Sequence, residues 1–180
     1  MRILAVCGSL QDKSRNRVLL DAAVALAPPG VVVVSFDGVR ELPHFNPDVD
    51  AIGTPASVQR WRQALADCDA VLIASPEYGH SLPGALKNAI DWVIGSGELE
   101  GKVVGITAAV PGPGRGRRGL RALADTLSAV RATIVGGVPI SPGAAFEPQV
   151  CWLVRAVVKA ARRRIIIHRE ESRPAVVRSQ

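Results

Sequence analysis

Cysteines, aromatic residues and long apolar runs are all scarce in this sequence of 180 residues. Phe, Trp and Tyr together make up 4% of it, yet 48% of the residues are apolar, which excludes an intrinsically disordered chain. Three widely spaced cysteines, Cys7, Cys68 and Cys151, predict neither a disulfide framework nor a metal knuckle. No run of about 20 apolar residues exists, so no membrane-spanning helix is predicted. The apolar run at the start of the chain ends at Gly8 and is too short for the apolar region of a signal peptide, so we expect a cytoplasmic protein.

An excess of positive charge is present, but it is confined to one end of the chain. The formal net charge is +6, while residues 1–150 carry 14 basic and 14 acidic side chains. Residues 151–180 carry eight basic side chains and two acidic ones. A nucleic-acid-binding domain is expected to have its basic residues spread over one face, so nucleic acid is not the predicted partner. We expect one domain over residues 1–164, followed by a divergent basic tail over residues 165–180.

Short apolar runs and helical stripes alternate along the chain. None of the runs alternates apolar with polar residues, and this is typical of strands buried on both faces of a parallel sheet. The five runs are residues 3–7, 31–36, 70–74, 103–108 and 133–138. Apolar residues at helical spacing lie between the runs and after the last one, where residues 150–161 predict a final packed helix. The pattern predicts an α/β domain with right-handed crossovers.

Ligands of such a sheet bind beyond the carboxyl ends of the strands, so the loops at residues 8–16, 37–50, 75–84 and 109–118 are candidates. In the first of these, hydroxyl, amide and cationic side chains stand at the start of a helix, where free backbone N–H groups suit a phosphate. An ordinary polar turn with Ser14 as the N-cap explains the same residues. The loop lacks the Walker A pattern and the Rossmann glycines.

Residues 114–119 match the pattern G-x-G-x-x-G. A dinucleotide site would place this pattern in the first strand–helix turn, with an acidic residue about 20 positions later, and residues 134–142 contain no acid. Arg115, Arg117 and Arg118 either attract a nucleotide phosphate at the rim of a site or form a solvated basic loop. Both interpretations remain open at this point.

The third loop is the most specific segment of the sequence. Residues 75–84 contain two prolines and two glycines, an aromatic ring at Tyr78 and polar side chains at His80 and Ser81. A proline near the start of a helix favours that start, and glycine lets a flat ligand approach the backbone closely. His80 is either a proton donor beside a ligand or a surface histidine of the loop.

This loop resembles that of the NADPH-dependent FMN reductase family, whose members carry P-E-Y-x-x-S-x-P-G-x-L-K-N-A-I-D-W. Residues 76–92 match that string, and Gly8, Ser9, Ser14 and Asn16 match the family's first-loop pattern G-S-x-R-x-x-S-x-N. The resemblance covers roughly residues 2–140 and implies a flavodoxin-like three-layer sandwich. Its five-stranded parallel sheet would have the order 2-1-3-4-5, with helices on both faces.

The resemblance also implies a flavin site. Two hydroxyls, an amide and the backbone amides of residues 10–16 would hold the FMN phosphate, and the third loop would line the ring and ribityl chain. The implied cofactor-binding residues are Ser9, Gln11, Ser14, Arg15, Asn16, Pro76, Glu77, Tyr78, Gly79 and Ser81. Gln11 replaces the family's usual Arg, which removes a charge-assisted contact, and Gly79-His80 replaces the commoner Asn-Gly. No metal site is implied.

The implied activity is a ping-pong transfer of hydride from NADPH or NADH to bound FMN, and then to a flavin, quinone, azo or metal-oxyanion acceptor. Members of the family are usually homodimers or homotetramers, and the helix over residues 85–94 is either an interface element or a core helix. One alternative is a flavodoxin-like electron carrier without its own NAD(P)H turnover. Another is a binding module whose basic tail contacts nucleic acid or an acidic membrane.

Overall fold

The fold is built on a five-stranded parallel sheet. The computed structural model describes residues 1–112 and 114–171. The strands are β1 (Arg2–Cys7), β2 (Val32–Phe36), β3 (Ala70–Ala74), β4 (Val103–Ala109) and β5 (Thr133–Ile140). All neighbouring strands are parallel, and their order is β2-β1-β3-β4-β5. This order confirms the predicted flavodoxin-like topology.

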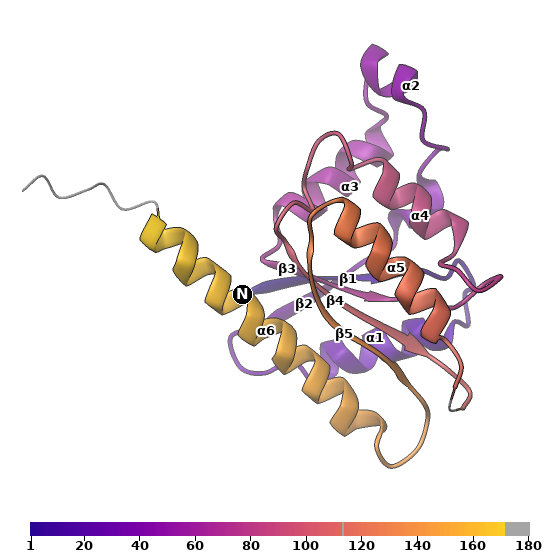
Figure 1. Cartoon of the computed structure of the whole chain (residues 1–180), viewed down its shortest axis with the longest axis vertical. Coiled ribbons are helices and arrows are strands. Elements are labelled where there is room, and N and C mark those ends of the chain that lie inside the picture. The colour runs from indigo at the N-terminus through magenta and orange to yellow at the C-terminus, as the bar shows by residue number, and fades with distance from the viewer. Residues whose placement is uncertain (113, 172–180) are drawn as a thin grey trace, which may run out of the picture.

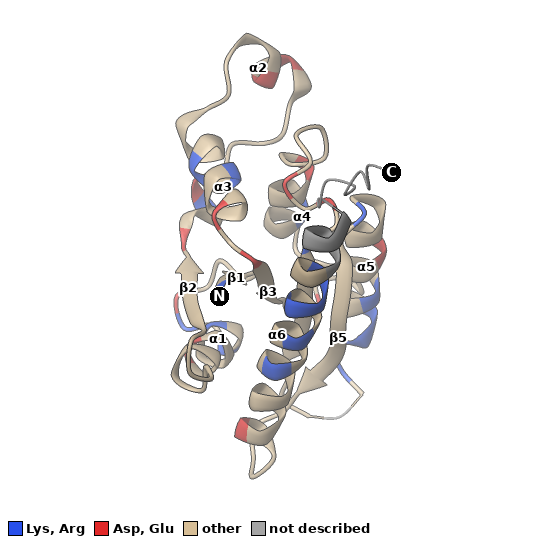
Figure 2. Cartoon of the chain, turned by 90° about the vertical axis from the view of Figure 1, so that its left-hand side faces the viewer, with Lys and Arg blue, Asp and Glu red and all other residues tan. Residues whose placement is uncertain are grey.

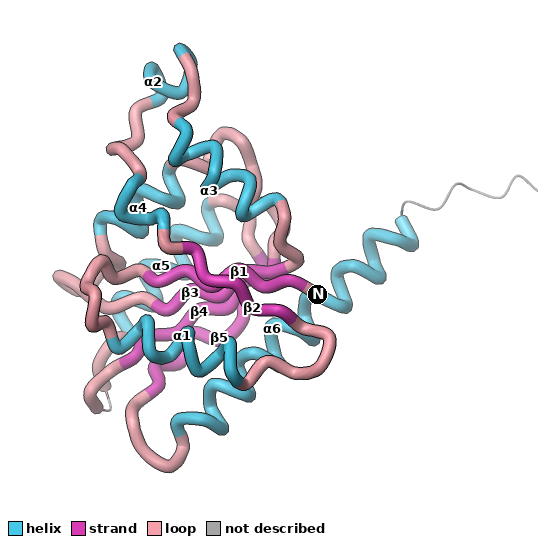
Figure 3. The backbone as a smooth tube through the Cα atoms, turned by 180° about the vertical axis from the view of Figure 1, so that it is seen from behind, coloured by secondary structure: helices cyan, strands magenta, loops and turns pink. Residues whose placement is uncertain are grey.

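Helices cover both faces of the sheet, which makes three layers (Figure 1). Seen from behind, α1 (Arg15–Ala25) and α6 (Phe146–Glu171) lie on one face (Figure 3). On the other face lie α3 (Ala56–Ala66), α4 (Gly84–Asp91) and α5 (Arg117–Ala129). Successive residues of β1 point into different layers, because Leu4 and Val6 belong to one apolar cluster and Ile3 and Ala5 to the other. Burial on both sides explains why the central strands β1, β3 and β4 read as continuous apolar runs.

The segment after β2 holds two short helices where a plain loop was expected. They are the 3₁₀ helix η1 (Gly38–Glu41) and α2 (Pro47–Ile52). Asn46 caps α2, and Pro47 occupies its first turn. No residue of α2 is buried, and the helix stands away from the sheet (Figure 1).

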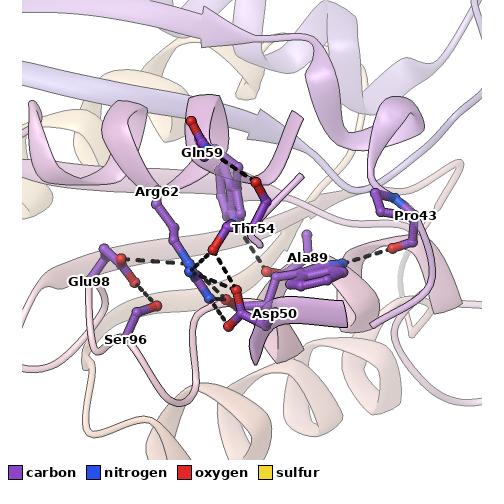
Figure 4. A network of polar contacts seen from close by, with 10 residues as sticks. Pro43, Asp50, Thr54, Gln59, Arg62, Ala89, Ser96 and Glu98 are labelled. Carbon is purple, nitrogen blue, oxygen red and sulfur yellow. Dashed lines mark hydrogen bonds and ion pairs between the residues drawn. The ribbon is translucent and has the colours of Figure 1, made fainter. Parts of the chain in front are cut away.

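Arg62 of α3 holds this exposed segment in place (Figure 4). Its guanidinium donates to both carboxylate oxygens of Asp50, at 3.1 and 2.7 Å, and to the carbonyl oxygen of Trp92 at 2.8 Å. Hydrogen bonds from Arg62 and then from Thr54 lower the pKa of Asp50. Glu98 lies 3.9 Å from the same guanidinium. A single arginine therefore joins α2 and α3 to the end of α4.

Trp92, at the end of α4, belongs to the core of its own chain. Its side chain is fully buried, and its Nε1 donates to the carbonyl oxygen of Pro43 at 2.8 Å. Its ring meets Phe45 edge-on, with 5.2 Å between the centroids. The core interpretation therefore holds for Trp92, whereas Ile94, two residues later, is 55% exposed.

The last helix continues beyond the predicted domain boundary. The side chains expected to pack, from Val150 to Ala161, are buried against the sheet. The helix then runs without a break past residue 164 to Glu171. Its basic residues up to position 164 are exposed, and Figure 2 shows their positions along the helix; they are Arg155, Lys159, Arg162, Arg163 and Arg164. Residues 172–180 of the predicted tail lie outside the described part of the chain.

Candidate functional site

Three loops meet at the carboxyl edge of the sheet, and direct hydrogen bonds join them. The backbone N–H of Gly8, after β1, donates to Ala74 at the end of β3 at 2.9 Å. The N–H of Ser75, after β3, donates to Thr107 of β4 at 2.9 Å. The side-chain oxygen of Asn16 accepts from the N–H of Ala109 at 2.8 Å. The loops that the sequence singled out after these three strands therefore form one site.

The first loop presents buried polar groups at the start of α1. Ser9, Ser14 and Asn16 are only 3 to 6% exposed, although all three are polar. Ser14 is the N-cap of α1, because its side chain accepts from the N–H of Asn16 at 3.2 Å. Among the described residues, no hydrogen bond uses the backbone N–H groups of Leu10 and Lys13. The capped turn that we predicted is present, and the same turn leaves donors available for an anion.

The other three predicted residues of the first loop, Gln11, Arg15 and Asn16, differ in exposure and in the contacts that they make. Asn16 ties α1 to β4 through its side-chain oxygen, which leaves only its amide N–H₂ for a ligand. The backbone N–H of Gln11 donates to Ser9 Oγ at 3.3 Å, and its side chain is exposed. Arg15 is also exposed and lines a separate cavity of about 760 Å³, between α1 and the start of α6.

The third loop is a tight hairpin. Tyr78 and Ser81 exchange two backbone hydrogen bonds, at 3.0 and 2.9 Å. The two residues between them, Gly79 and His80, both have positive φ angles, of 55° and 63°. A type I′ turn requires this conformation, and Asn-Gly is its favoured dipeptide, so the replacement by Gly79-His80 keeps the turn. The hairpin presents the Tyr78 ring, which is 49% exposed.

Glu77 anchors this hairpin to the start of α5. One carboxylate oxygen accepts from the backbone N–H of Gly119 at 2.8 Å, and the other lies 3.2 Å from Nδ1 of His80. The Gly119 N–H bond, and then the His80 contact, lower the pKa of Glu77. His80 is a surface residue of the loop, with 69% of its side chain exposed. The prediction that Glu77 lines the flavin stays a prediction, and in the structure its carboxylate joins two loops.

Two glycines of the G-x-G-x-x-G segment allow close packing at the start of α5. A Cβ on Gly119 would lie 2.9 Å from Cβ of Glu77, and one on Gly116 would lie 2.8 Å from the Val110 side chain. Gly116 also has a left-handed φ of 81°. Gly119 therefore allows α5 to pack closely against Glu77 of the third loop, and Gly116 allows the start of α5 to pack closely against the end of β4. Sequence reasoning missed the role of Gly119, although an acid in one loop and a glycine at the start of the next helix were both visible.

A cavity of about 510 Å³ lies between the third and fourth loops. Pro76, Glu77 and His80 line one side of it. The opposite side is formed by the end of β4 and the fourth loop, with Ala109, Val110, Pro111, Gly114, Arg115, Gly116 and Arg118. The cavity therefore lies between the hairpin and two arginines.

The residues present fit an FMN molecule. The donor set at the start of α1, with two buried hydroxyls and open backbone N–H groups, suits a phosphate monoester. The hairpin and the cavity beside it supply a wall for a flat ring system. Within residues 1–112 and 114–171, no group of three or more potential metal ligands occurs.

Comparison with known proteins gives a family for this site. The family model described as NADPH-dependent FMN reductase matches residues 1–145, which include all three loops. The chain belongs to this family. The match ends one residue before α6, so the whole of that helix and the basic end lie outside it.

Curated relatives and solved structures agree with this assignment. The chain is 40% identical over 119 residues to an NAD(P)H-dependent FMN reductase of Pseudomonas aeruginosa. The aligned residues make up 66% of this chain and 63% of that relative. It is 38% identical over 95 residues to an NAD(P)H:quinone oxidoreductase of Solanum tuberosum, covering 51% and 49%. The match thus spans about half to two thirds of these relatives. The flavoenzyme FerB of Paracoccus denitrificans, an NAD(P)H:(acceptor) oxidoreductase, superposes with a TM-score of 0.76 at 26% identity, covering 88% and 98%.

Proposed function

We propose that this protein is an FMN-dependent NAD(P)H oxidoreductase. The observation that carries the proposal is the meeting of two features at one sheet edge. One is the capped start of α1, with its buried hydroxyls and open N–H groups, and the other is the cavity between the third and fourth loops. A phosphate at the first feature and a flat ring toward the second match the two ends of FMN. Bound FMN would supply hydride transfer, which no amino-acid side chain performs.

The residues of the chain would bind and orient the reactants. Ser9, Ser14 and the N–H groups of residues 10–16 would hold the phosphate, and the dipole of α1 would favour its negative charge. The hairpin from Pro76 to Ser81 would fix the ring plane, with Tyr78 as an aromatic wall. Glu77 would act indirectly, because its bond to Gly119 sets the distance between the two loops that flank the ring.

The reaction would follow a ping-pong order, in which the two substrates would use the same site one after the other. NADPH or NADH would bind first and leave oxidised before the acceptor enters. Flavins and quinones are the acceptors named for the curated relatives, and we extend the proposal to azo compounds and metal oxyanions. No helix in the described part of the chain is long and apolar enough to cross a membrane. A cytoplasmic homodimer or homotetramer is part of the proposal.

Purification followed by spectroscopy and kinetics tests the proposal. We expect flavin absorbance that is released on denaturation and identified as FMN, and steady-state oxidation of NADPH or NADH with a quinone or free FMN. Initial rates at varied concentrations of both substrates should give parallel double-reciprocal lines. A protein that cannot be loaded with FMN would overturn the proposal. A protein that holds FMN but does not oxidise NAD(P)H would be an electron carrier instead.

A further inference from the structure

The side of α6 that faces away from the sheet carries one stripe of exposed side chains, which we call the α6 stripe. Its members follow one another at intervals of three and four residues, and this spacing places them on one side of a helix. They are Trp152, Arg155, Lys159, Arg162 and Ile166, and all five are exposed. The side chains that pack on the sheet, among them Leu153, Val154 and Val157, occupy the opposite side. About 21 Å of helix separates the two ends of the stripe.

The charge of the α6 stripe is of one sign (Figure 2). Residues 148–169 contain no acid, so no carboxylate accompanies these cations along the helix. Among the side chains that the structure describes, Arg155, Lys159 and Arg162 form no ion pair with an acid of any other element. Arg163, beside the stripe, is likewise exposed and in none of these ion pairs. The surface is therefore suited to an anionic partner.

Both ends of the α6 stripe are apolar. Trp152 is 57% exposed and Ile166 is 56% exposed. Trp152 also lines a hollow of about 240 Å³ together with Val138 of the edge strand β5, and Val138 is 55% exposed. The partner should therefore offer negative charge to the middle of the stripe and an apolar environment to its ends.

We propose that the α6 stripe docks the protein on an anionic lipid bilayer. The lipid phosphates would lie against the cations, and the Trp152 and Ile166 side chains would enter the interfacial region between headgroups and acyl chains. A second copy of the chain does not fit, because two such stripes would place cations against cations. A nucleic acid would match the cations but leave both apolar ends in water. The whole stripe lies outside residues 1–145, the part of the chain that matches the family model.

Binding to lipid vesicles tests this proposal on the full chain. Vesicles of mixed phosphatidylcholine and phosphatidylglycerol would be compared with vesicles of phosphatidylcholine alone, by sedimentation at low and at high salt. Lipids with brominated acyl chains add a local probe, because bromine quenches the fluorescence of a tryptophan that it contacts. Trp61 and Trp92 are buried, so this quenching would report on Trp152. We expect binding to the anionic vesicles at low salt, weaker binding at high salt, and quenching of Trp152.

The chain offers a matched control for the charge of the stripe. We would compare the double variant R155Q/K159Q with R117Q/R121Q, which removes two exposed arginines at the same spacing from α5, on the other face of the sheet. R155Q/K159Q should weaken binding to the anionic vesicles by roughly 10- to 50-fold, whereas R117Q/R121Q should stay within about twofold of the original affinity. Thermal melts would confirm that both variants are folded.

Other outcomes would overturn the proposal. Equal losses in the two double variants would reduce the effect to net charge, and vesicle binding without quenching of Trp152 would place the contact on another surface. No binding to anionic vesicles at low salt would exclude docking. A labelled DNA duplex should bind more weakly than the vesicles at the same salt concentration. Tighter binding of the duplex that R155Q/K159Q abolishes would make the stripe a nucleic-acid site. None of these measurements needs FMN or turnover, so the result is independent of the proposed function.

Discussion

The starts of α1 and α5 lie at the same sheet edge, and each follows a strand and a polar loop. They differ in whether a carboxylate of the protein already accepts a hydrogen bond from their backbone N–H groups. Ser14 caps α1 from within its own loop, and the N–H groups before it stay open. Gly116, the N-cap of α5, has no side chain to offer, and Glu77 from another loop supplies the acceptor. The start of α5 is thus already bound by the Glu77 carboxylate, whereas the N–H groups at the start of α1 are free to bind the anion of a ligand.

This difference shows why a glycine pattern alone does not identify a phosphate site. The fourth loop has the pattern G-x-G-x-x-G, and the first loop does not. The decisive feature is whether the helix start already has a carboxylate, and this depends on a tertiary contact 42 residues apart in sequence. A phosphate would have to displace Glu77 from α5, but it meets no such competitor at α1.

Blocking the close contact between Gly119 and Glu77 should have the largest effect on stability and on FMN binding. In Gly119→Val, the new Cβ would lie 2.9 Å from Cβ of Glu77 and 3.0 Å from its Cα, so the hairpin would have to move. We expect the free energy of unfolding to fall by about 1–3 kcal/mol. The affinity for FMN should fall at least tenfold, because the hairpin flanks the ring. Denaturant unfolding of the FMN-free protein and fluorescence titration with FMN would measure both effects.

Gly95→Val is the control for steric crowding. Gly95 is exposed, and a Cβ there would meet no atom within 4 Å. Its free energy of unfolding should change by less than about 0.5 kcal/mol. Equal effects of the two substitutions would show that the contact between Glu77 and Gly119 does not hold the loops together.

Removing the cap of α1 should have a smaller effect on stability. Ser14→Ala deletes the oxygen that accepts from the N–H of Asn16, so unfolding should become easier by about 1 kcal/mol. The melting temperature should fall by about 2–4 °C for a chain of this size. Ser9→Ala is the matched variant, because Ser9 is an equally buried hydroxyl that accepts from Gln11 within the loop and caps no helix. It should weaken FMN binding with little change in melting temperature, whereas equal melting temperatures for both variants would contradict the cap.

Much of the fold could be predicted, because the three central strands are buried on both faces and each packed helix has an apolar stripe. The exception is α2, which buries no side chain and so leaves no periodic signal. Only the pair Asn46-Pro47, a cap followed by a proline, marks its start. In the site, the cap at Ser14 is local and was predicted. The bond from Gly119 to Glu77 was not, because it depends on how two distant loops pack.

Neutralising Glu77 should change the dependence of stability on pH. The fold lowers the pKa of Glu77, so its charged form stabilises the protein above the pKa of the unfolded chain, and this contribution is lost as the pH falls through the folded pKa. In Glu77→Gln, the amide oxygen can still accept from Gly119, but the charge is absent. The melting temperature of the original protein should exceed that of the variant at pH 6, and the difference should shrink as the pH falls from about 4.3 through the lowered pKa of folded Glu77.

His80→Ala separates the two contacts of Glu77. It removes the second cause of the lowered pKa and keeps the Gly119 bond, so its pH profile should lie between those of the original protein and Glu77→Gln. Thermal melts from pH 3 to 7 without FMN would measure all three. A constant difference between the original protein and Glu77→Gln over this range would contradict the role of the charge.

Adding a cation to the first loop should have the smallest effect. Gln11 is exposed, so an arginine there has room to reach a phosphate at the start of α1, but water and salt would screen it. Gln11→Arg should therefore tighten FMN binding by only about two- to tenfold at low salt, and the gain should shrink at high salt. Gln149→Arg, an equally exposed glutamine on α6, controls for the added charge and should have no effect. If both variants tightened FMN binding equally, the phosphate would be responding to net charge, and the start of α1 would lose its distinction from that of α5.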